Sequence, residues 1–206
     1  ADKVQFKVVG ADIQQFLDVL QAERELSDRT MNAAISQIRF FTIYVLHKPW
    51  DPTQIPLRKF DTYLPFVPTQ QEVKTFISTI PDIKQKAMVA VMYSSGLRIG
   101  EVCSLRYEDI QRKNMRIHIT HSKNRSDRYA VLSKYALDIL TQYWFACGRP
   151  TGWLFPKQTD PSRPIDTFFF FFFFFFHEKK LGWPRRLTCH SFRHAFGTHL
   201  YETGVD

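Results

Sequence analysis

The chain has 206 residues, of which 44% are hydrophobic and 23% charged, a balance typical of a soluble globular protein with one or two domains. Lysine and arginine exceed aspartate and glutamate by 28 to 20, so the net charge of +8 indicates a polyanionic partner such as DNA or RNA. A generic basic protein fits that charge equally well. The 3 cysteines form no C-x-x-C pair, which argues against a zinc ribbon or a disulfide framework. With no signal-peptide pattern, we expect a cytoplasmic protein.

The first part of the chain, residues 1–55, predicts a small helical unit. Apolar residues of its first helix recur at the spacing of one helical face: Ile13, Phe16, Leu17 and Leu20. Ser27 can cap a second helix, which Lys48-Pro49 should end because the residue before a proline avoids helical geometry. The buried stripe expected on this second helix consists of Met31, Ala34, Ile35, Ile38, Phe41, Thr42 and Val45.

A proline-rich stretch then separates two units, and we expect residues 56–68 to be a linker. Residues Thr69 to Glu72 form a capping box that should start the first helix of a larger unit, 69–206. The apolar stripe of that helix is Val73, Phe76, Ile77 and Ile80.

The rest of the larger unit predicts mainly helices with one small antiparallel sheet. Gly96 should stop a helix over 83–95, and a short helix should follow over 98–105. Two alternating segments, 116–120 and 128–132, predict a strand pair joined by a polar loop. Further helices are expected after Ser133, with Leu137, Leu140 and Trp144 inward, and over 190–203.

An unbroken run of phenylalanines covers residues 168–176. Nine residues cannot cross a bilayer as a helix, which needs ~20. The run is atypical of natural sequence, so only its position enters the interpretation.

Two clusters carry candidate chemistry. Arg98 lies in the first, Arg193 and His190 in the second, and Lys123 falls between them in the predicted hairpin loop. Guanidinium groups can grip the non-bridging oxygens of a phosphodiester, where charge builds up during displacement. A lysine can protonate a leaving oxygen, and a histidine can move a proton near neutral pH. The set suits phosphoryl transfer without a metal.

The pattern of these clusters resembles the tyrosine recombinase (phage integrase) family. G-L-R-x-x-E-x-x-x-L spans 96–105, Lys123 follows, and H-x-x-R-H-x-x-x-T-H-L-x-x-x-G spans 190–204, in the order and spacing of that family. The resemblance implies the family's catalytic fold over 69–206, preceded by a partial helical SAM-like core-binding domain over 1–55.

By this resemblance, Arg98 and Arg193 hold the scissile phosphate, Lys123 acts as the general acid, His190 assists proton transfer and Glu101 is a supporting carboxylate. The family attacks DNA with a tyrosine to form a 3′-phosphotyrosyl link, with no metal, ATP or other cofactor. Its final His or Trp and that tyrosine should follow Asp206. We therefore expect this chain to grip the phosphate without attacking it.

The resemblance also implies duplex DNA as partner and a homotetramer on two DNA sites. Two alternatives remain: a DNA-binding relative without catalysis, and an enzyme like a type IB topoisomerase. His190 and His194 have the spacing of a metal pair, but the guanidinium of Arg193 between them disfavours a cation. Candidate DNA contacts are Arg29, Arg39, Arg125, Arg128 and Arg186.

Overall fold

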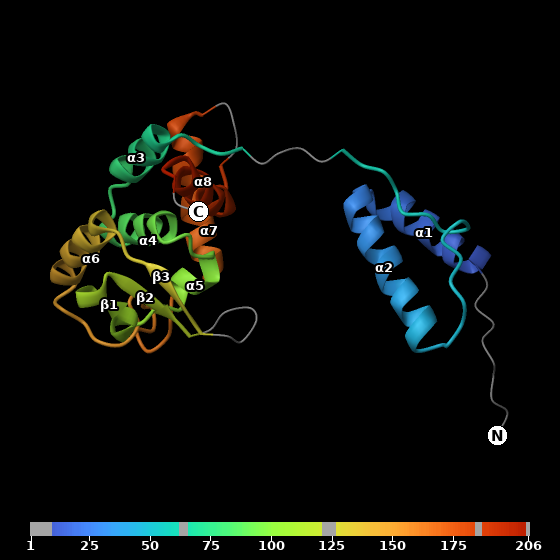
Figure 1. Cartoon of the computed structure of the whole chain (residues 1–206), viewed down its shortest axis with the longest axis horizontal. Helices are drawn as coiled ribbons and strands as arrows, with labels where there is room; N and C mark the ends of the chain where they lie inside the picture. The colour runs from blue at the N-terminus through green and yellow to red at the C-terminus, as the bar shows by residue number, and fades with distance from the viewer. Residues whose placement is uncertain (1–9, 62–65, 121–126, 184–186, 205–206) are drawn as a thin grey trace, which may run out of the picture. The chain divides into compact units, whose positions relative to one another are not determined.

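The computed structural model of the chain describes residues 10–61, 66–120, 127–183 and 187–204. The chain divides into two compact units, 1–64 and 65–206, each with its own hydrophobic core. The division falls inside the stretch predicted as a linker. The described residues are mainly helical with one small antiparallel sheet, as the sequence predicts (Figure 1). None of the helices in these ranges is long and apolar enough to span a membrane.

Within residues 10–61, the first unit contains two helices, α1 (Gly10–Arg24) and α2 (Asp28–Tyr44). Ser27 caps α2 as predicted, because its side chain accepts a hydrogen bond from the backbone N–H of Thr30. The helix ends at Tyr44, before the Lys48-Pro49 pair that was expected to end it. The small core is formed by Leu17, Met31, Ile35 and Ile55.

Three residues assigned to the buried stripes of α1 and α2 are instead on the surface. Phe16 is 52% exposed, Phe41 51% and Val45 53%. The prediction was wrong because one neighbouring helix and one extended segment cover only a narrow strip of each helix. The spacing of apolar residues gives a face, but the partners decide how much of it is buried.

The segment after α2 runs back along that helix. Ile55 is buried, and the side-chain amide of Asn32 both donates to the carbonyl of Arg58 (2.9 Å) and accepts from its N–H (2.8 Å). Residues 55–58 therefore pack onto α2, although 56–58 belong to the predicted linker.

The second unit is arranged around α4 (Ile83–Ser94), which lies in its middle (Figure 1). Residues 87–92 of α4 are all buried, as expected for a helix that is covered on every side. The preceding helix, α3 (Gln70–Thr79), begins with the predicted Thr69–Glu72 capping box and buries all four residues of its predicted stripe. The short α5 (Ile99–Cys103) follows the turn at Gly96.

The sheet has three antiparallel strands in the order β1 (Ile110–Gln111), β2 (Arg116–Ile119) and β3 (Arg128–Val131). The β2–β3 pair matches the predicted hairpin, with Ile119 opposite Arg128. Strand β1 was not predicted because its two residues are too few to show alternation. It lies between two short 3-10 helices, η1 (Tyr107–Asp109) and η2 (Arg112–Asn114).

Three longer helices complete the unit: α6 (Lys134–Ala146), α7 (Thr167–Leu181) and α8 (Cys189–Glu202). Ser133 caps α6 as predicted, but the buried face of that helix is shifted, leaving Leu137 and Trp144 only half-buried. The phenylalanine run lies within α7, a helix that was not predicted. Its buried members are Phe170, Phe173 and Phe174.

Candidate active site

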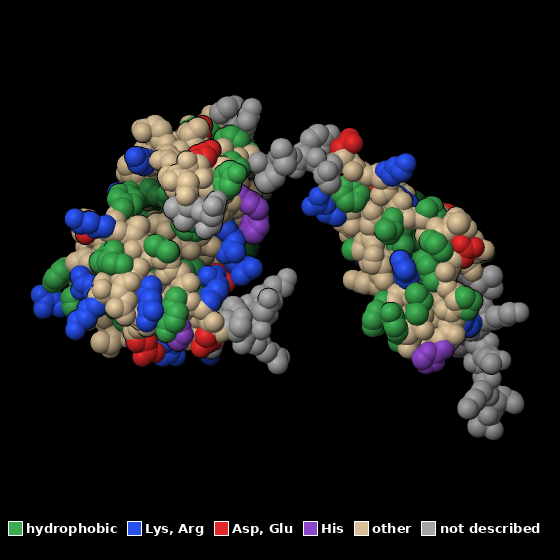
Figure 2. Space-filling model, in the orientation of Figure 1, with side chains coloured by type: hydrophobic (Ala, Val, Ile, Leu, Met, Phe, Trp, Pro, Cys, Tyr) green, Lys and Arg blue, Asp and Glu red, His purple; other side chains and the backbone are tan. Residues whose placement is uncertain are grey.

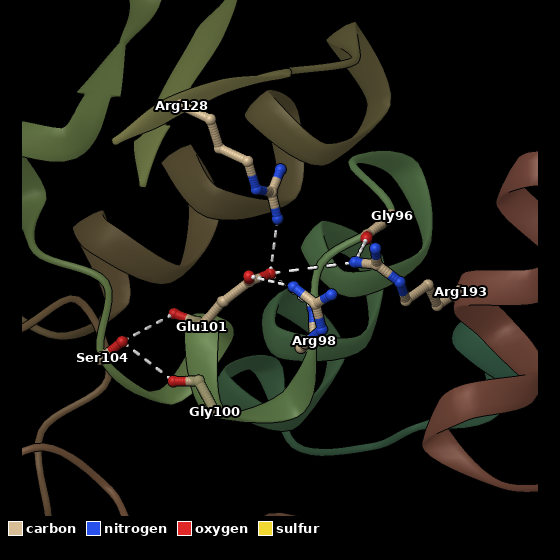
Figure 3. A network of polar contacts seen from close by, with 7 residues as sticks. All are labelled: Gly96, Arg98, Gly100, Glu101, Ser104, Arg128 and Arg193. Carbon is tan, nitrogen blue, oxygen red and sulfur yellow. Dashed lines mark hydrogen bonds and ion pairs between the residues drawn. The ribbon is translucent and has the colours of Figure 1, made fainter. Parts of the chain in front are cut away.

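A single buried carboxylate, Glu101, is the centre of the candidate site. Only 4% of its side chain is exposed, and three arginines from three different elements point toward it (Figure 3). They are Arg98 before α5, Arg128 at the start of β3 and Arg193 on α8. Burial of a carboxylate is costly unless charged partners and hydrogen bonds compensate it, so this arrangement identifies Glu101 as an organising residue.

Arg98 is held by local structure. It is the N-cap residue of α5, and its backbone N–H donates to Glu101 Oε2 (2.8 Å), which closes a capping interaction across one helical turn. Its guanidinium Nη1 donates to Glu101 Oε1 (3.0 Å), while 45% of the side chain stays exposed. Glu101 thus orients the Arg98 head group and leaves part of it free for an anion.

Arg193 reaches the same place from a distant part of the sequence. Its Nη1 donates to the carbonyl oxygen of Gly96 (2.5 Å) and lies 3.9 Å from Glu101 Oε2. Gly96 has a φ of +59°, in the left-handed region that favours glycine, so the chain can turn sharply between α4 and α5. This turn brings the two arginines of the sequence motifs to one carboxylate.

Arg128 makes the shortest of the three contacts with Glu101. Its Nη2 donates to Oε2 at 2.7 Å, and about a third of the side chain (34%) is exposed. The sequence interpretation gave Arg128 only a DNA-contact role. Its place at the site depends on β3 passing beside α5, which sequence spacing does not reveal.

The electrostatics of the cluster follow from this arrangement. Burial alone would raise the pKa of Glu101, but hydrogen bonds from the Arg98 backbone and from the Arg128 and Arg98 side chains outweigh it and lower that pKa. Burial, followed by repulsion from Arg98, lowers the pKa of Arg193. The cluster therefore holds three cations around one anion, a net positive charge that suits a phosphate.

His190 stands exposed in the first turn of α8, one turn before Arg193. Its ring meets that of His194 edge-on, with the centroids 4.7 Å apart. Partial burial, and then repulsion from His194, Arg193 and Arg98, lower the pKa of His190, which favours its neutral form near pH 7. A neutral imidazole can accept a proton.

The remaining predicted site residues are placed as follows. Lys123, Arg125 and Arg186 lie outside the described residues. Arg29 and Arg39 are exposed on the first unit, where the Arg29 guanidinium lies over the ring of Phe60 (5.3 Å). Among the residues that the structure describes, no group of three or more His, Cys, Asp or Glu side chains has the arrangement of a metal site.

Lys and Arg side chains are spread over the visible face of both units, interspersed with hydrophobic ones (Figure 2). The charge excess of the sequence is therefore not confined to the Glu101 cluster. Cationic side chains scattered in this way can each neutralise a backbone phosphate.

The fold of the second unit, a helical domain with a three-stranded antiparallel sheet, is that of tyrosine recombinase catalytic domains. A crystal structure of the XerH site-specific recombinase bound to palindromic difH substrate, a post-cleavage complex, superposes with a TM-score of 0.77. The match covers 97% of this chain and 61% of that one at 18% sequence identity.

Sequence comparisons identify the family. The model of the phage integrase family matches residues 67–206. Two proteins of Sinorhizobium fredii, the putative integrase/recombinases y4eF and y4qK, are each 34% identical to this chain over 95% of its length. The chain spans 77% of the first protein and 63% of the second. It belongs to the phage integrase family of tyrosine recombinases.

Proposed function

We propose that this chain is the DNA-gripping part of a site-specific recombinase or integrase, and that the Glu101 cluster binds the scissile phosphate. The observation that carries the proposal is the convergence of Arg98 and Arg193, which lie far apart in the sequence, on one buried carboxylate. A purely structural ion pair needs one cation. Three partly exposed guanidiniums around one carboxylate leave donors available for a second anion.

The roles within the reaction follow from the chemistry of each group. Arg98 and Arg193 each donate to a non-bridging oxygen and stabilise the charge that builds up there. Glu101 orients the guanidinium of Arg98 and pairs with that of Arg193. Hydrogen bonds from Arg98 and Arg128 keep Glu101 ionised. His190, exposed beside them, helps to move the proton of the attacking hydroxyl.

Cleavage itself requires two further groups. A tyrosine C-terminal to residue 206 attacks the phosphorus, and its oxygen forms the 3′-phosphotyrosyl bond as the bond to the 5′-oxygen breaks. Lys123 donates the proton that the leaving 5′-oxygen takes up. A 5′-hydroxyl of a second strand then attacks the phosphotyrosyl link and releases the tyrosine, so no ATP and no metal is consumed. On this proposal, duplex DNA is the partner, and four copies act on two sites.

The first test uses the 206-residue chain with duplexes selected by binding from a random pool. We expect binding whose logarithmic affinity falls linearly with the logarithm of the salt concentration, because lysine and arginine displace counterions. We also expect no covalent adduct. An adduct would mean that a tyrosine within the chain can attack, and Tyr201→Phe would then show whether the exposed Tyr201 is responsible.

The second test uses a longer protein that contains this chain and the segment after it, with a nicked suicide duplex. We expect a covalent protein–DNA adduct that forms equally well in excess EDTA. Arg98→Ala should slow its formation by about 100- to 1000-fold, the usual cost of removing one donor to a developing oxyanion. Binding without any adduct would favour a DNA-binding relative that lacks catalysis. Relaxation of a supercoiled circle without joining of two duplexes would favour the topoisomerase-like reaction.

A further inference from the structure

One side of α8 packs against the turn that precedes Arg98. Arg193, Phe196 and His199 are spaced three residues apart on this helix, so they lie along the same side of it. All three contact the segment 93–96, at the end of α4. Only one residue, Leu97, separates this segment from Arg98. The position of α8 along α4 therefore decides where Arg193 stands relative to Arg98.

Two of these contacts meet at Gly96. The carbonyl of Gly96 accepts the hydrogen bond from Arg193, and the ring of Phe196 covers its α-carbon so closely that a Cβ there would lie 2.4 Å from Phe196 Cδ1. The ring contact is apolar and non-directional. This contact holds α8 against the 93–96 segment, but it does not by itself fix the position of α8 along that segment.

The third contact is directional. The Tyr93 hydroxyl and His199 Nδ1 are hydrogen-bonded at 2.8 Å, and their rings pack nearly edge-on with centroids 6.0 Å apart. His199 is 8% exposed, so loss of this partner would leave a buried ring nitrogen without a hydrogen bond. Tyr93 also meets Phe192 of α8 edge-on, with the ring centroids 6.2 Å apart, so its ring contacts this helix at two residues.

We propose that Tyr93 and His199 are a positioning pair, whose hydrogen bond sets the register of α8 against the 93–96 turn and so places Arg193 beside Arg98 for a shared phosphate. Neither residue touches the phosphate. The inference rests on the proposed function, because it assigns a purpose to the alignment of these arginines. An error of an ångström in such an alignment is enough to weaken a site of this kind strongly.

The test measures phosphate binding by the 206-residue chain, with inorganic phosphate as the probe and the arginine Nε–Hε signals in NMR spectra as the readout. Tyr93→Phe removes one oxygen and keeps the ring. We expect phosphate to bind about three- to tenfold more weakly to this variant, the effect of one lost hydrogen bond. We also expect the Arg193 signal to move in the phosphate-free state. The matched control is Tyr201→Phe, which alters a tyrosine on the same helix that is 75% exposed and should change neither.

A second pair of variants separates the hydrogen bond from general packing. His199→Leu removes the bonding atom, whereas His199→Asn keeps a polar atom near the position of Nδ1. We expect phosphate affinity to fall in His199→Leu and to return most of the way in His199→Asn. In the double variant Tyr93→Phe/His199→Leu, the loss should be no greater than in either single variant, because both remove the same bond.

The outcomes distinguish this inference from the proposed function. If phosphate moves no arginine signal in the unaltered chain, the proposed phosphate site is wrong. If phosphate moves the Arg98 and Arg193 signals but Tyr93→Phe binds it as tightly as the unaltered chain, the positioning pair alone is overturned. Equal losses in His199→Asn and His199→Leu would also overturn it. Should the His199 variants fail to fold, the comparison of Tyr93→Phe with Tyr201→Phe decides the matter.

Discussion

The two units of this chain bury apolar surface to very different extents. In the second unit, α4 is covered on every side, and its core extends from α3 through the sheet to α8. The first unit buries Leu17, Met31, Ile35 and Ile55, whereas Phe40, Phe41 and Tyr44 on α2 are more than half exposed. The difference shows that the arginines of the Glu101 cluster stand on a closed, well-packed scaffold. The first unit, by comparison, has little core of its own to hold its helices.

The largest effect expected on stability is in the core of the second unit. Phe76 of α3 is fully buried, and its ring packs against those of Phe174 on α7 and Phe192 on α8. The distances between ring centroids are 4.7 Å and 5.0 Å. Phe76→Ala should lower the free energy of unfolding of this unit by about 3–5 kcal/mol. Urea titration followed residue by residue by NMR would measure it. The two cores share no residue among those described, so the urea midpoint of residues 10–61 should be the same in Phe76→Ala as in the unaltered chain. An equal fall of the midpoint in both units would contradict the view that their cores are separate.

A smaller effect is expected at the centre of the site. Glu101→Gln keeps the shape of the side chain but removes the charge that three arginines share, and should cost about 1.5–3 kcal/mol. The exposed Glu108→Gln is the control and should stay within about 0.5 kcal/mol. Equal stability of the two variants would show that the cluster contributes nothing to the fold.

The pH dependence of that difference has a definite sign. The pKa of Glu101 is lower in the folded chain than in the unfolded one, so the unfolded state binds more protons in the acid range. The stabilising contribution is present above the unfolded pKa and is lost as pH falls through the folded pKa. The gap in unfolding free energy between the unaltered chain and Glu101→Gln should therefore narrow on acidification. A gap that widened would contradict the lowered pKa.

Helix caps offer a finer comparison of the two units. The Thr69 cap is reciprocal: Glu72 donates its N–H to Thr69 (3.2 Å), and its carboxylate accepts from the Thr69 N–H (2.7 Å). The Ser27 hydroxyl accepts a longer bond from the Thr30 N–H (3.4 Å) and is also hydrogen-bonded to the Thr30 hydroxyl (2.9 Å), but no side chain bonds back to the Ser27 N–H among the described contacts. Thr69→Ala should cost the second unit about 1 kcal/mol, and Ser27→Ala should cost the first unit about half as much. Thermal unfolding of each variant measures its loss of stability. A larger loss in Ser27→Ala than in Thr69→Ala would contradict the capping geometry of the two helices.

The smallest effect is expected on the exposed face of α2. Phe41→Ser should change the unfolding free energy by no more than about 0.5 kcal/mol, because half of the ring is already in water. A loss as large as that of Phe76→Ala would mean that this face is covered in solution. Denaturant titration over a range of protein concentrations would then show whether a second copy covers it.

The elements that the sequence predicted well are those set by neighbouring residues. The capping box at Thr69 and the stripe of α3 are local patterns, and both are present in the structure. The phenylalanine run has no periodicity, so its helix, α7, could not be read from it. Phe16 and Phe41 were assigned to buried stripes, but burial depends on the partner elements, and these are few in the first unit.

The same distinction applies to the site. The contact between Arg98 and Glu101 spans one helical turn, so a sequence motif is enough to suggest it. The contacts of Arg128 with Glu101 and of Tyr93 with His199 join residues 27 and 106 positions apart, and only the packing of β3 and α8 brings them together. Lys123 falls outside the described residues, so its catalytic role stays a prediction drawn from the family motif.

The most direct test of the central claim compares one arginine from each unit in a longer protein that carries the nucleophilic tyrosine. Arg193→Ala and Arg39→Ala each remove one positive charge, and each is assayed for DNA affinity and for the rate of covalent adduct formation on a suicide duplex. We predict that Arg193→Ala slows adduct formation by about 100- to 1000-fold while DNA affinity falls far less. Arg39→Ala should change affinity alone. Undiminished adduct formation in Arg193→Ala would contradict the claim that the Glu101 cluster grips the scissile phosphate.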